Sequence, residues 1–284
     1  MSSLFCFGLG YSAGFLARDL AARGWGVAGT SREGGASPDG FALGRFGRSA
    51  PLADPAGALA GTTHLLISVP PDAAGDPVLA EHGRDIAALG ELRWVGYLST
   101  TGVYGDRGGG WVDESSDLQP TGERGRRRVA AEAGWLDLHR RHGLPLHIFR
   151  LAGIYGPGRS ALDAVREGRA QRVDKPGQVF SRIHVADIVQ VLRASMARPN
   201  PGAIYNVCDD DPAPPEAVIA YACELLRVTI LPLVPFDQAV LSPMARSFYD
   251  DNKRVANRRI KEELDVRLLY PSYKDGLRAL LGRT

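Results

Sequence analysis

The first half of the chain alternates short apolar runs with stretches of helical character. Strands separated by helices favour right-handed crossovers, which build a parallel sheet with helices on both faces. The runs are apolar at nearly every position, as expected of strands in such a covered sheet. The pattern therefore predicts an α/β fold, a Rossmann-type doubly wound parallel sheet. The predicted strands are residues 4–7, 25–30, 64–69, 93–98 and 146–151, and the predicted long helix is residues 122–142.

Beyond about residue 155 the alternation loosens, and prolines separate short elements. Helices predicted at residues 185–196 and 215–226 flank a predicted strand at residues 203–207. We therefore expect a smaller, partly discontinuous C-terminal substrate lobe, with the ligand bound near the carboxyl ends of the strands. The predicted dinucleotide-binding domain is residues 1–155, to which residues 180–207 return, and the predicted lobe is residues 156–179 and 208–284.

Composition excludes several classes of protein. The 34 basic and 32 acidic residues leave a net charge of +2, which predicts neither a nucleic acid nor an anionic membrane as partner. No apolar run is long enough to span a membrane, and three glycines break the apolar start, which no positive charge precedes, so we expect no signal peptide. Cys6, Cys208 and Cys223 fit neither a disulfide framework nor a metal site, and the histidines show no metal spacing. These features predict a metal-free, cytoplasmic protein with reduced thiols.

Residues 8–13, Gly-Leu-Gly-Tyr-Ser-Ala, follow a predicted strand and open a predicted helix. The first glycine permits a tight turn, the second lets a pyrophosphate approach the backbone, and the alanine allows close packing of helix on strand. The helix N-terminus then faces the phosphates. The motif predicts a dinucleotide site, with a glycine-rich turn that binds nothing as the alternative. The expected contacts are Gly8, Gly10, Tyr11, Ser12 and Ala13.

The second predicted strand ends in Thr30, Ser31 and Arg32. An NAD site usually has an Asp or Glu here, which binds the ribose 2′-hydroxyl. Two hydroxyls and a guanidinium suit a 2′-phosphate instead, so the segment favours NADP over NAD. The neighbouring Glu33 leaves NAD open, and a solvated loop arginine is the alternative interpretation.

Three later motifs occur in a fixed order: Ser-Thr-Thr-Gly-Val-Tyr-Gly at residues 99–105, Ile-Tyr-Gly-Pro-Gly-Arg at 154–159 and Arg-Ile-His-Val-Ala-Asp-Ile at 182–188. Together with the N-terminal motif, they resemble the extended short-chain dehydrogenase/reductases, the superfamily of NAD-dependent epimerases and dehydratases acting on nucleotide sugars. The resemblance covers about residues 4–200. It implies an NAD(P)-binding oxidoreductase or epimerase with a small, anionic substrate such as a nucleotide sugar, and, by analogy with relatives, a homodimer.

The resemblance also implies an unusual active site. The family's Tyr-x-x-x-Lys pair aligns with Arg124 and Arg128, so the usual proton donor and its partner are missing. A guanidinium, with a pKa above about 12, cannot exchange protons near neutral pH, although Arg128 can still donate hydrogen bonds to ribose hydroxyls. The basic helix face suits an anionic ligand, or is simply solvated. The glycine loop, one residue shorter than usual, likewise resembles the atypical branch of the superfamily.

If the protein is an enzyme, its proton must move through another group, with Tyr104, His184 and the pair Asp113–Glu114 as candidates. His184 is equally consistent with a packed core histidine beside Asp187. The alternative function is a catalytically inactive, NADP-binding sensor or regulatory module. The remaining expected site residues are Thr100, Tyr104 and His184 for catalysis; Ser68, Val69, Ser99 and Arg128 for the cofactor; and Arg124, Tyr155, Arg159 and Arg182 for the substrate.

Overall fold

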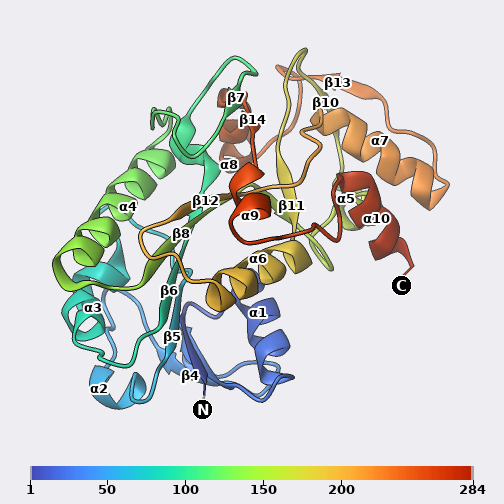
Figure 1. The fold of residues 1–284 in the computed structure, drawn as a ribbon. Coiled ribbons are helices and arrows are strands. Elements are labelled where there is room, and N and C mark those ends of the chain that lie inside the picture. Colours follow the sequence, from blue (N-terminus) through green and yellow to red (C-terminus); the bar gives the residue numbers. More distant parts are fainter. Residues whose placement is uncertain (1, 283–284) are drawn as a thin grey trace. The chain divides into compact units, whose positions relative to one another are not determined.

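An eight-stranded sheet is the main feature of the computed structural model, which describes residues 2–282 (Figure 1). Its strand order is β12-β8-β6-β5-β1-β2-β4-β3. The pairings of β1 with β2 and β5, of β2 with β4 and of β5 with β6 are parallel, which confirms the predicted α/β fold with a mostly parallel sheet. The strands are β1 (Ser3–Phe7), β2 (Gly26–Ser31), β3 (Gly35–Ala36), β4 (Ala42–Arg45), β5 (His64–Ile67), β6 (Trp94–Thr100), β8 (Leu146–Leu151) and β12 (Ile204–Val207).

The described chain divides into two compact units, each built from three stretches. Unit 1 comprises residues 2–100, 123–150 and 189–205, and unit 2 comprises residues 101–122, 151–188 and 206–282. The loop of residues 101–122 belongs to unit 2, although it lies between a strand and a helix of unit 1. No helix in residues 2–282 is long and apolar enough to cross a membrane.

Helix α3 (Pro77–Ala87) begins where the local sequence supplies a cap. Asp76 caps α3 by accepting a hydrogen bond from the Leu79 amide, and Pro77 occupies the first helical position, where its missing N–H costs nothing. The predicted long helix is confirmed as α4, which begins one residue later than expected. The helices are α1 (Tyr11–Ala21), α2 (Pro55–Ala58), α3 (Pro77–Ala87), α4 (Glu123–His142) and α6 (Val185–Ala197), the last of which crosses the boundary between the units.

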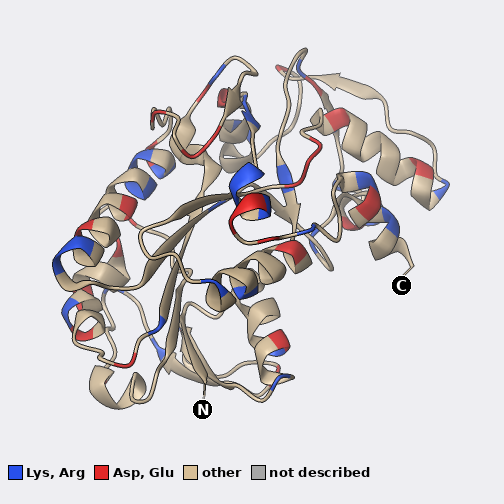
Figure 2. Cartoon of the chain, viewed as in Figure 1, with Lys and Arg blue, Asp and Glu red and all other residues tan. Residues whose placement is uncertain are grey.

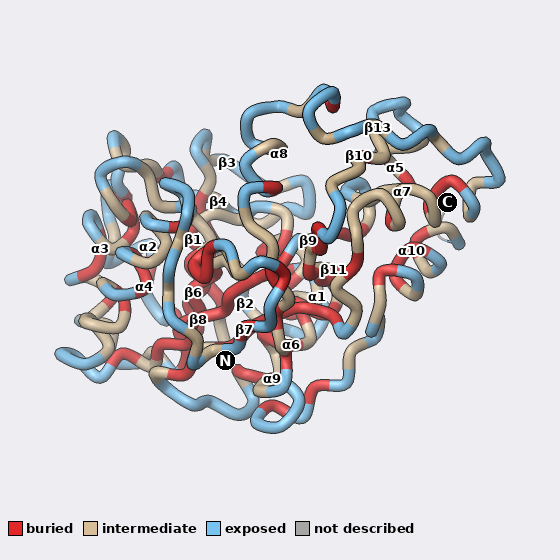
Figure 3. Tube along the Cα trace, turned by 90° about the horizontal axis from the view of Figure 1, so that it is seen from above, coloured by how far each residue is buried: buried red, intermediate tan, exposed pale blue. Residues whose placement is uncertain are grey.

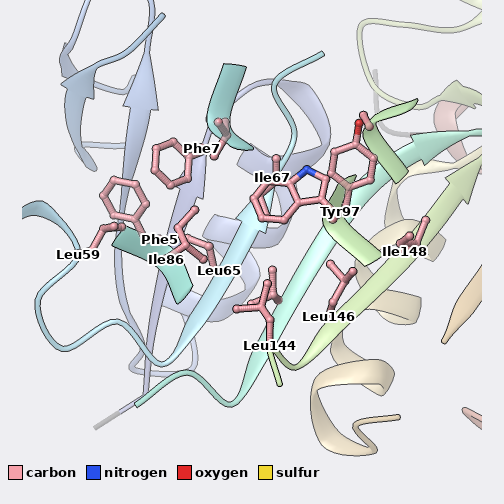
Figure 4. Packing of buried hydrophobic residues seen from close by; sticks show 14 of the residues in the cluster. Phe5, Phe7, Leu59, Leu65, Ile67, Ile86, Tyr97, Leu144, Leu146 and Ile148 are labelled. Atoms are coloured by element: carbon pink, nitrogen blue, oxygen red, sulfur yellow. The ribbon is translucent and has the colours of Figure 1, made fainter. Parts of the chain in front are cut away.

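The core of unit 1 lies between the sheet and helices α3 and α4. Strands β5, β6 and β8 are buried along nearly their whole length, as Figure 3 shows for β6 and β8. Figure 4 shows Phe5, Phe7, Ile67, Tyr97 and Ile148 packed from neighbouring strands. Each such side chain contributes about 1.5–3 kcal/mol when it is fully buried, so this cluster stabilises the sheet that carries the first candidate site.

Unit 2 consists of short elements around a second core between α5, α7 and α10. Its strands form three parallel pairs, β9 with β11, β10 with β13 and β7 with β14. The elements are η1 (Thr101–Tyr104), β7 (Trp111–Val112), β9 (Gly153–Tyr155), α5 (Ala161–Arg166), β10 (Arg172–Asp174), β11 (Arg182–His184), α7 (Pro215–Leu226), β13 (Leu233–Pro235), α8 (Pro243–Ser247), η2 (Phe248–Asp250), β14 (Arg254–Val255), α9 (Arg258–Glu262) and α10 (Tyr273–Leu281).

Candidate functional sites

The turn between β1 and α1 has the geometry of a phosphate cradle. Gly8 has a φ of +83°, and a Cβ there would lie 2.9 Å from Cγ2 of Val69, so only glycine fits without strain. Gly10 is the N-cap of α1 and offers no side-chain acceptor to the first amides of the helix. A Cβ on Gly10 would meet nothing within 4 Å, so the space in front of these amides is open. The residues present therefore fit a dinucleotide pyrophosphate.

Hydroxyl groups at the ends of β2 and β5, the two strands that flank β1, hold this turn in place. Thr30 Oγ1 accepts a hydrogen bond from the Gly8 amide at 2.9 Å, and Ser68 Oγ donates to the Gly8 carbonyl. Thr30 is fully buried, so its hydroxyl supports the glycine turn and does not face the ligand space. Both Ser68 and Val69 are half-buried and lie against Gly8.

The end of β2 carries an arginine, Arg32, that is available to bind an anion. Ser31 Oγ accepts a hydrogen bond from the Gly34 amide at 2.8 Å, which closes a tight turn after the strand. Arg32 is exposed and makes no hydrogen bond or ion pair within residues 2–282. A free guanidinium at this strand end is available to a ribose phosphate.

Ser99 and Thr100, the two hydroxyl residues that were predicted as site residues at the end of β6, have different surroundings. Ser99 is buried and donates a hydrogen bond to Glu132 Oε1 at 2.5 Å, and Glu132 is in turn paired with Arg150. Ser99 therefore contributes to the internal packing of α4 against the sheet. Thr100 is half-buried at the last position of the strand.

Helix α4 carries both arginines that align with the missing catalytic pair. The Arg128 Nη1 donates to the Leu98 carbonyl at 2.5 Å and to the Tyr97 hydroxyl at 3.2 Å, which holds this guanidinium against β6. Arg124 is exposed at the start of the helix. Charges of both signs alternate along α4 (Figure 2), where Arg126 and Arg127 form ion pairs with Glu123. These two arginines belong to a solvated helix face.

The proposed proton-transfer residues lie inside unit 2. Tyr104 is fully buried, and its hydroxyl donates to Asn206 Oδ1 at 2.7 Å. His184 is 1% exposed, accepts a hydrogen bond from the Ala186 amide through Nδ1, and packs against the Tyr155 and Tyr270 rings. Both side chains therefore have core environments.

The two candidate carboxylates differ from each other. Asp113 is exposed and bonded to Ser115 and Ser116, and these hydrogen bonds lower the pKa of its carboxyl. Burial instead raises the pKa of Glu114, which accepts a hydrogen bond from the Asn206 amide at 2.7 Å.

A pocket of about 450 Å³ lies within unit 2, between α5, α7 and α10. It brings together Tyr155, Arg159 and Arg182, three of the four residues predicted to bind substrate. Tyr249 and Tyr273 add two aromatic walls, and the only charged side chains among the lining residues are arginines. A cavity with aromatic walls and guanidinium groups suits an anionic organic molecule.

Two buried ionisable groups were not found by sequence reasoning. Lys253 donates hydrogen bonds from Nζ to the Gly105 carbonyl and to Asp251 Oδ2, each at 2.9 Å, and burial lowers the pKa of its ammonium. Asp209 is 1% exposed, and its amide donates a hydrogen bond to the Arg182 carbonyl at 2.7 Å. Neither occurs in a recognisable motif, and only the fold buries them. Residues 2–282 contain no cluster of three or more His, Cys, Asp or Glu side chains suited to a metal ion.

Known structures define the class of this fold. UDP-glucuronic acid 4-epimerase from Bacillus cereus, in complex with UDP-glucuronic acid and NAD, has a TM-score of 0.79 with this chain, 15% identity, and coverage of 99% of this chain and 98% of that one. The chain thus has the Rossmann-type fold of the NAD-dependent epimerases and dehydratases. No family model matches it.

Sequence similarity then identifies the family more narrowly. A functionally unknown conserved protein from Silicibacter pomeroyi DSS is 55% identical, with a TM-score of 0.88 and coverage of 100% of this chain and 99% of that one. The chain belongs to the same family as that protein. Protein YeeZ of Escherichia coli (strain K12) is 28% identical over 288 residues, which cover 95% of this chain and 97% of that protein.

Proposed function

We propose that the protein is a nicotinamide-dinucleotide-dependent oxidoreductase of the epimerase or dehydratase type, acting on a nucleotide sugar or another small anionic substrate. The observation that carries this proposal is the cradle at Gly8 and Gly10, which leaves open space before the uncapped start of α1. The Bacillus cereus epimerase, which shares the fold, binds NAD and UDP-glucuronic acid.

The cofactor is expected to bind with its pyrophosphate on the first amides of α1. Arg32, exposed at the end of β2, favours NADP because its guanidinium can bind a 2′-phosphate with two hydrogen bonds. The nicotinamide of such a cofactor accepts or donates hydride when bound. The Nη2 and Nε groups of Arg128 remain for ribose hydroxyls, since Nη1 is bonded to Leu98 and Tyr97.

The substrate is expected in the pocket of unit 2, with Tyr155, Arg159 and Arg182 among its contacts. Three arginines line this pocket and no Asp or Glu does, which supports an anionic ligand. Thr100 is assigned to the orientation of the reacting hydroxyl or carbonyl. Arg124, exposed at the start of α4, is assigned to the substrate's negative charge.

A second candidate function has support of its own. Tyr104 and His184, the side chains best suited to transfer a proton, are both buried in unit 2. A protein with a dinucleotide cradle whose tyrosine and histidine candidates are both buried would act as a sensor or regulatory module that binds NADP without turnover.

Substitution of Gly10 by valine tests the cofactor assignment. The variant should fold normally, because a Cβ there meets no atom within 4 Å, but its NADP affinity should fall at least about tenfold because the side chain fills the cradle. Gly14→Ala is the matched control, since its Cβ would lie 3.9 Å from Arg18 Nη1. Equal NADP affinity in the wild type and Gly10→Val would contradict the assignment.

Turnover distinguishes the two functions. The wild type is incubated with NADP or NAD and with sugar nucleotides, including UDP-glucuronic acid, and reduced nicotinamide is followed at about 340 nm while products are separated by chromatography. Conversion of any substrate supports the enzyme, whereas tight cofactor binding without conversion of any of them supports the sensor.

A further inference from the structure

Tyr97 places a hydroxyl group in the core of unit 1, where packing alone does not require one. The residue lies in β6, is fully buried, and is paired in register with Ile67 of β5. Its ring belongs to the apolar cluster (Figure 4), and its centroid is 6.1 Å from that of the Trp135 ring. A phenylalanine would fill the same space, and a buried hydroxyl is costly unless it is hydrogen-bonded. The partner of this hydroxyl therefore indicates what it does.

That partner is Arg128 of helix α4. Arg128 Nη1 donates to the Tyr97 hydroxyl at 3.2 Å, and within residues 2–282 this hydroxyl has no other hydrogen-bond partner. The guanidinium also lies over the Tyr97 ring, with Cζ 5.6 Å from the ring centroid. Burial raises the pKa of the Tyr97 hydroxyl, so the group stays neutral and serves Arg128 as a fixed acceptor.

The Arg128 guanidinium is anchored through a single nitrogen. Besides the Tyr97 hydroxyl, Nη1 reaches the Leu98 carbonyl at 2.5 Å, so each of its two hydrogens has an acceptor. Because a guanidinium is planar, two fixed acceptors on one nitrogen also set the direction of the other N–H groups. Nε and Nη2 make no hydrogen bond within residues 2–282. Their direction is therefore set by Tyr97 and Leu98 before any ligand binds.

Arg128 also differs in charge from its neighbours on α4. Arg126 and Arg127 both form ion pairs with Glu123, whereas half-buried Arg128 forms none with any residue in the range 2–282. The Arg128 charge acts on Asp76 only from a distance, where it lowers the pKa of that carboxyl against the effect of burial. A guanidinium that is ordered but not neutralised by a carboxylate suits contact with an anionic, hydroxyl-bearing ligand.

We propose that Tyr97 is a positioning residue of the dinucleotide site: its hydroxyl and the Leu98 carbonyl hold the Arg128 guanidinium in the orientation in which Nε and Nη2 bind the ribose hydroxyls. The inference rests on the proposed function, in which Arg128 contacts the ribose, and adds the residue that orients this contact. Tyr97 is fully buried and touches no ligand itself. An arginine that is ordered in advance loses less side-chain entropy on binding, so the hydroxyl strengthens binding through Arg128.

A double-mutant cycle on NADP binding tests this role. The dissociation constant is measured by fluorescence titration for the wild type, Tyr97→Phe, Arg128→Ala and the double variant. Tyr97→Phe should weaken NADP binding about threefold to tenfold, the range expected for the loss of one hydrogen bond. In the Arg128→Ala background the same substitution should change the affinity by less than about twofold, because no guanidinium is left to orient.

Tyr205→Phe is the matched control, since Tyr205 is a fully buried tyrosine at the other end of the same unit's sheet, in β12. It should bind NADP as the wild type does, and thermal unfolding shows whether each variant folds. Equal NADP affinity in the wild type and Tyr97→Phe would overturn the proposal. An equal loss in both backgrounds would also overturn it, because the hydroxyl would then act only on the packing of unit 1.

Arg128→Lys decides the question even if Tyr97→Phe does not fold. Lysine keeps the positive charge but has no planar group that two fixed acceptors can orient, so NADP affinity should fall about tenfold, as in Arg128→Ala. Wild-type affinity in Arg128→Lys would show that charge alone is sufficient, and would overturn the positioning role.

Failure of this inference can be told apart from failure of the proposed function. If the wild type binds NADP but Arg128→Ala binds it equally well, the positioning role is wrong and the glycine cradle remains. If the wild type binds neither NADP nor NAD, the cofactor assignment is wrong, and the role of Tyr97 is wrong with it.

Discussion

Arg150 and Glu132 form a buried ion pair, with Nη2 of the arginine 2.7 Å from Oε2 of the glutamate. Their side chains are 3% and 2% exposed, and Ser99 donates to the same carboxylate. The ion pair joins β8 to α4, which carries Arg128, and the Ser99 hydrogen bond joins the same carboxylate to β6, which carries Thr100. It holds the helix that bears the candidate cofactor arginine against the sheet.

Removal of one partner of this pair should destabilise unit 1. Glu132→Gln removes the carboxylate charge that is paired with the buried Arg150 guanidinium, so the free energy of unfolding should fall by about 3–5 kcal/mol in urea denaturation. Glu123→Gln removes an exposed carboxylate from the same helix and should leave stability unchanged. A similar small change for both variants would show that the buried pair does not hold α4.

Arg128→Ala should weaken dinucleotide binding by about tenfold, because charge-assisted hydrogen bonds to the ribose are lost. The measurement is the NADP dissociation constant by fluorescence titration, with thermal unfolding as a check on folding. Arg126→Ala is the control, since Arg126 is exposed and paired with Glu123 on the solvated face. Unchanged NADP affinity in Arg128→Ala would remove this residue from the cofactor site.

Arg32→Ala should lower the affinity for NADP by about tenfold or more and leave the affinity for NAD nearly unchanged, since only NADP carries the 2′-phosphate. The ratio of the two dissociation constants is the readout. Glu33→Gln, one residue further along the same exposed turn, should not reduce this ratio. If Arg32→Ala has the wild-type ratio, the NADP preference is wrong.

His147 should make unit 1 sensitive to acid. Burial lowers the pKa of His147 to about 4, below the value of about 6.5 expected in the unfolded chain. The unfolded state therefore binds more protons as the pH falls from 6.5 towards 4, and native stability decreases over that window. The stabilising contribution is complete above about pH 6.5.

The contribution of His147 to this loss of stability at low pH can be isolated with the His147→Gln variant. The difference in unfolding free energy between the wild type and this variant should shrink by up to about 3 kcal/mol between pH 7 and pH 4. His142→Gln, an exposed histidine at the end of α4, should show no such change. A pH-independent difference for His147→Gln would mean that this histidine takes up its proton at the same pH in the native protein as in the unfolded chain.

Much of the fold of unit 1 was predictable because its signals are local. The apolar runs that became β1, β5 and β8 are buried on both faces, so their composition alone indicates covered strands. The glycines of the β1–α1 turn meet a backbone requirement set by their own φ angle and neighbours. The short strands β3 and β4, which form one end of the sheet, lie in a glycine-rich, largely exposed segment that has no such pattern, and they were not predicted.

The role of each polar side chain depended on contacts far away in sequence. Thr30 and Ser99 both follow apolar strands, as cofactor ligands do, yet the first supports Gly8 and the second bonds Glu132. A hydroxyl at a strand end has the same local sequence whether it faces a ligand or a neighbouring element.

The three consecutive aspartates at residues 209–211 show most clearly which properties come from the sequence and which come from the tertiary structure. The sequence by itself determined the strand, the glycine cradle and the presence of three consecutive carboxylates. Only the tertiary structure decided that Asp209 is buried beside Arg182 while Asp210 binds Lys261 near the surface. The reason is that desolvation and the nearest counter-charge are set by segments distant in the chain, and these two factors determine what a carboxylate can do.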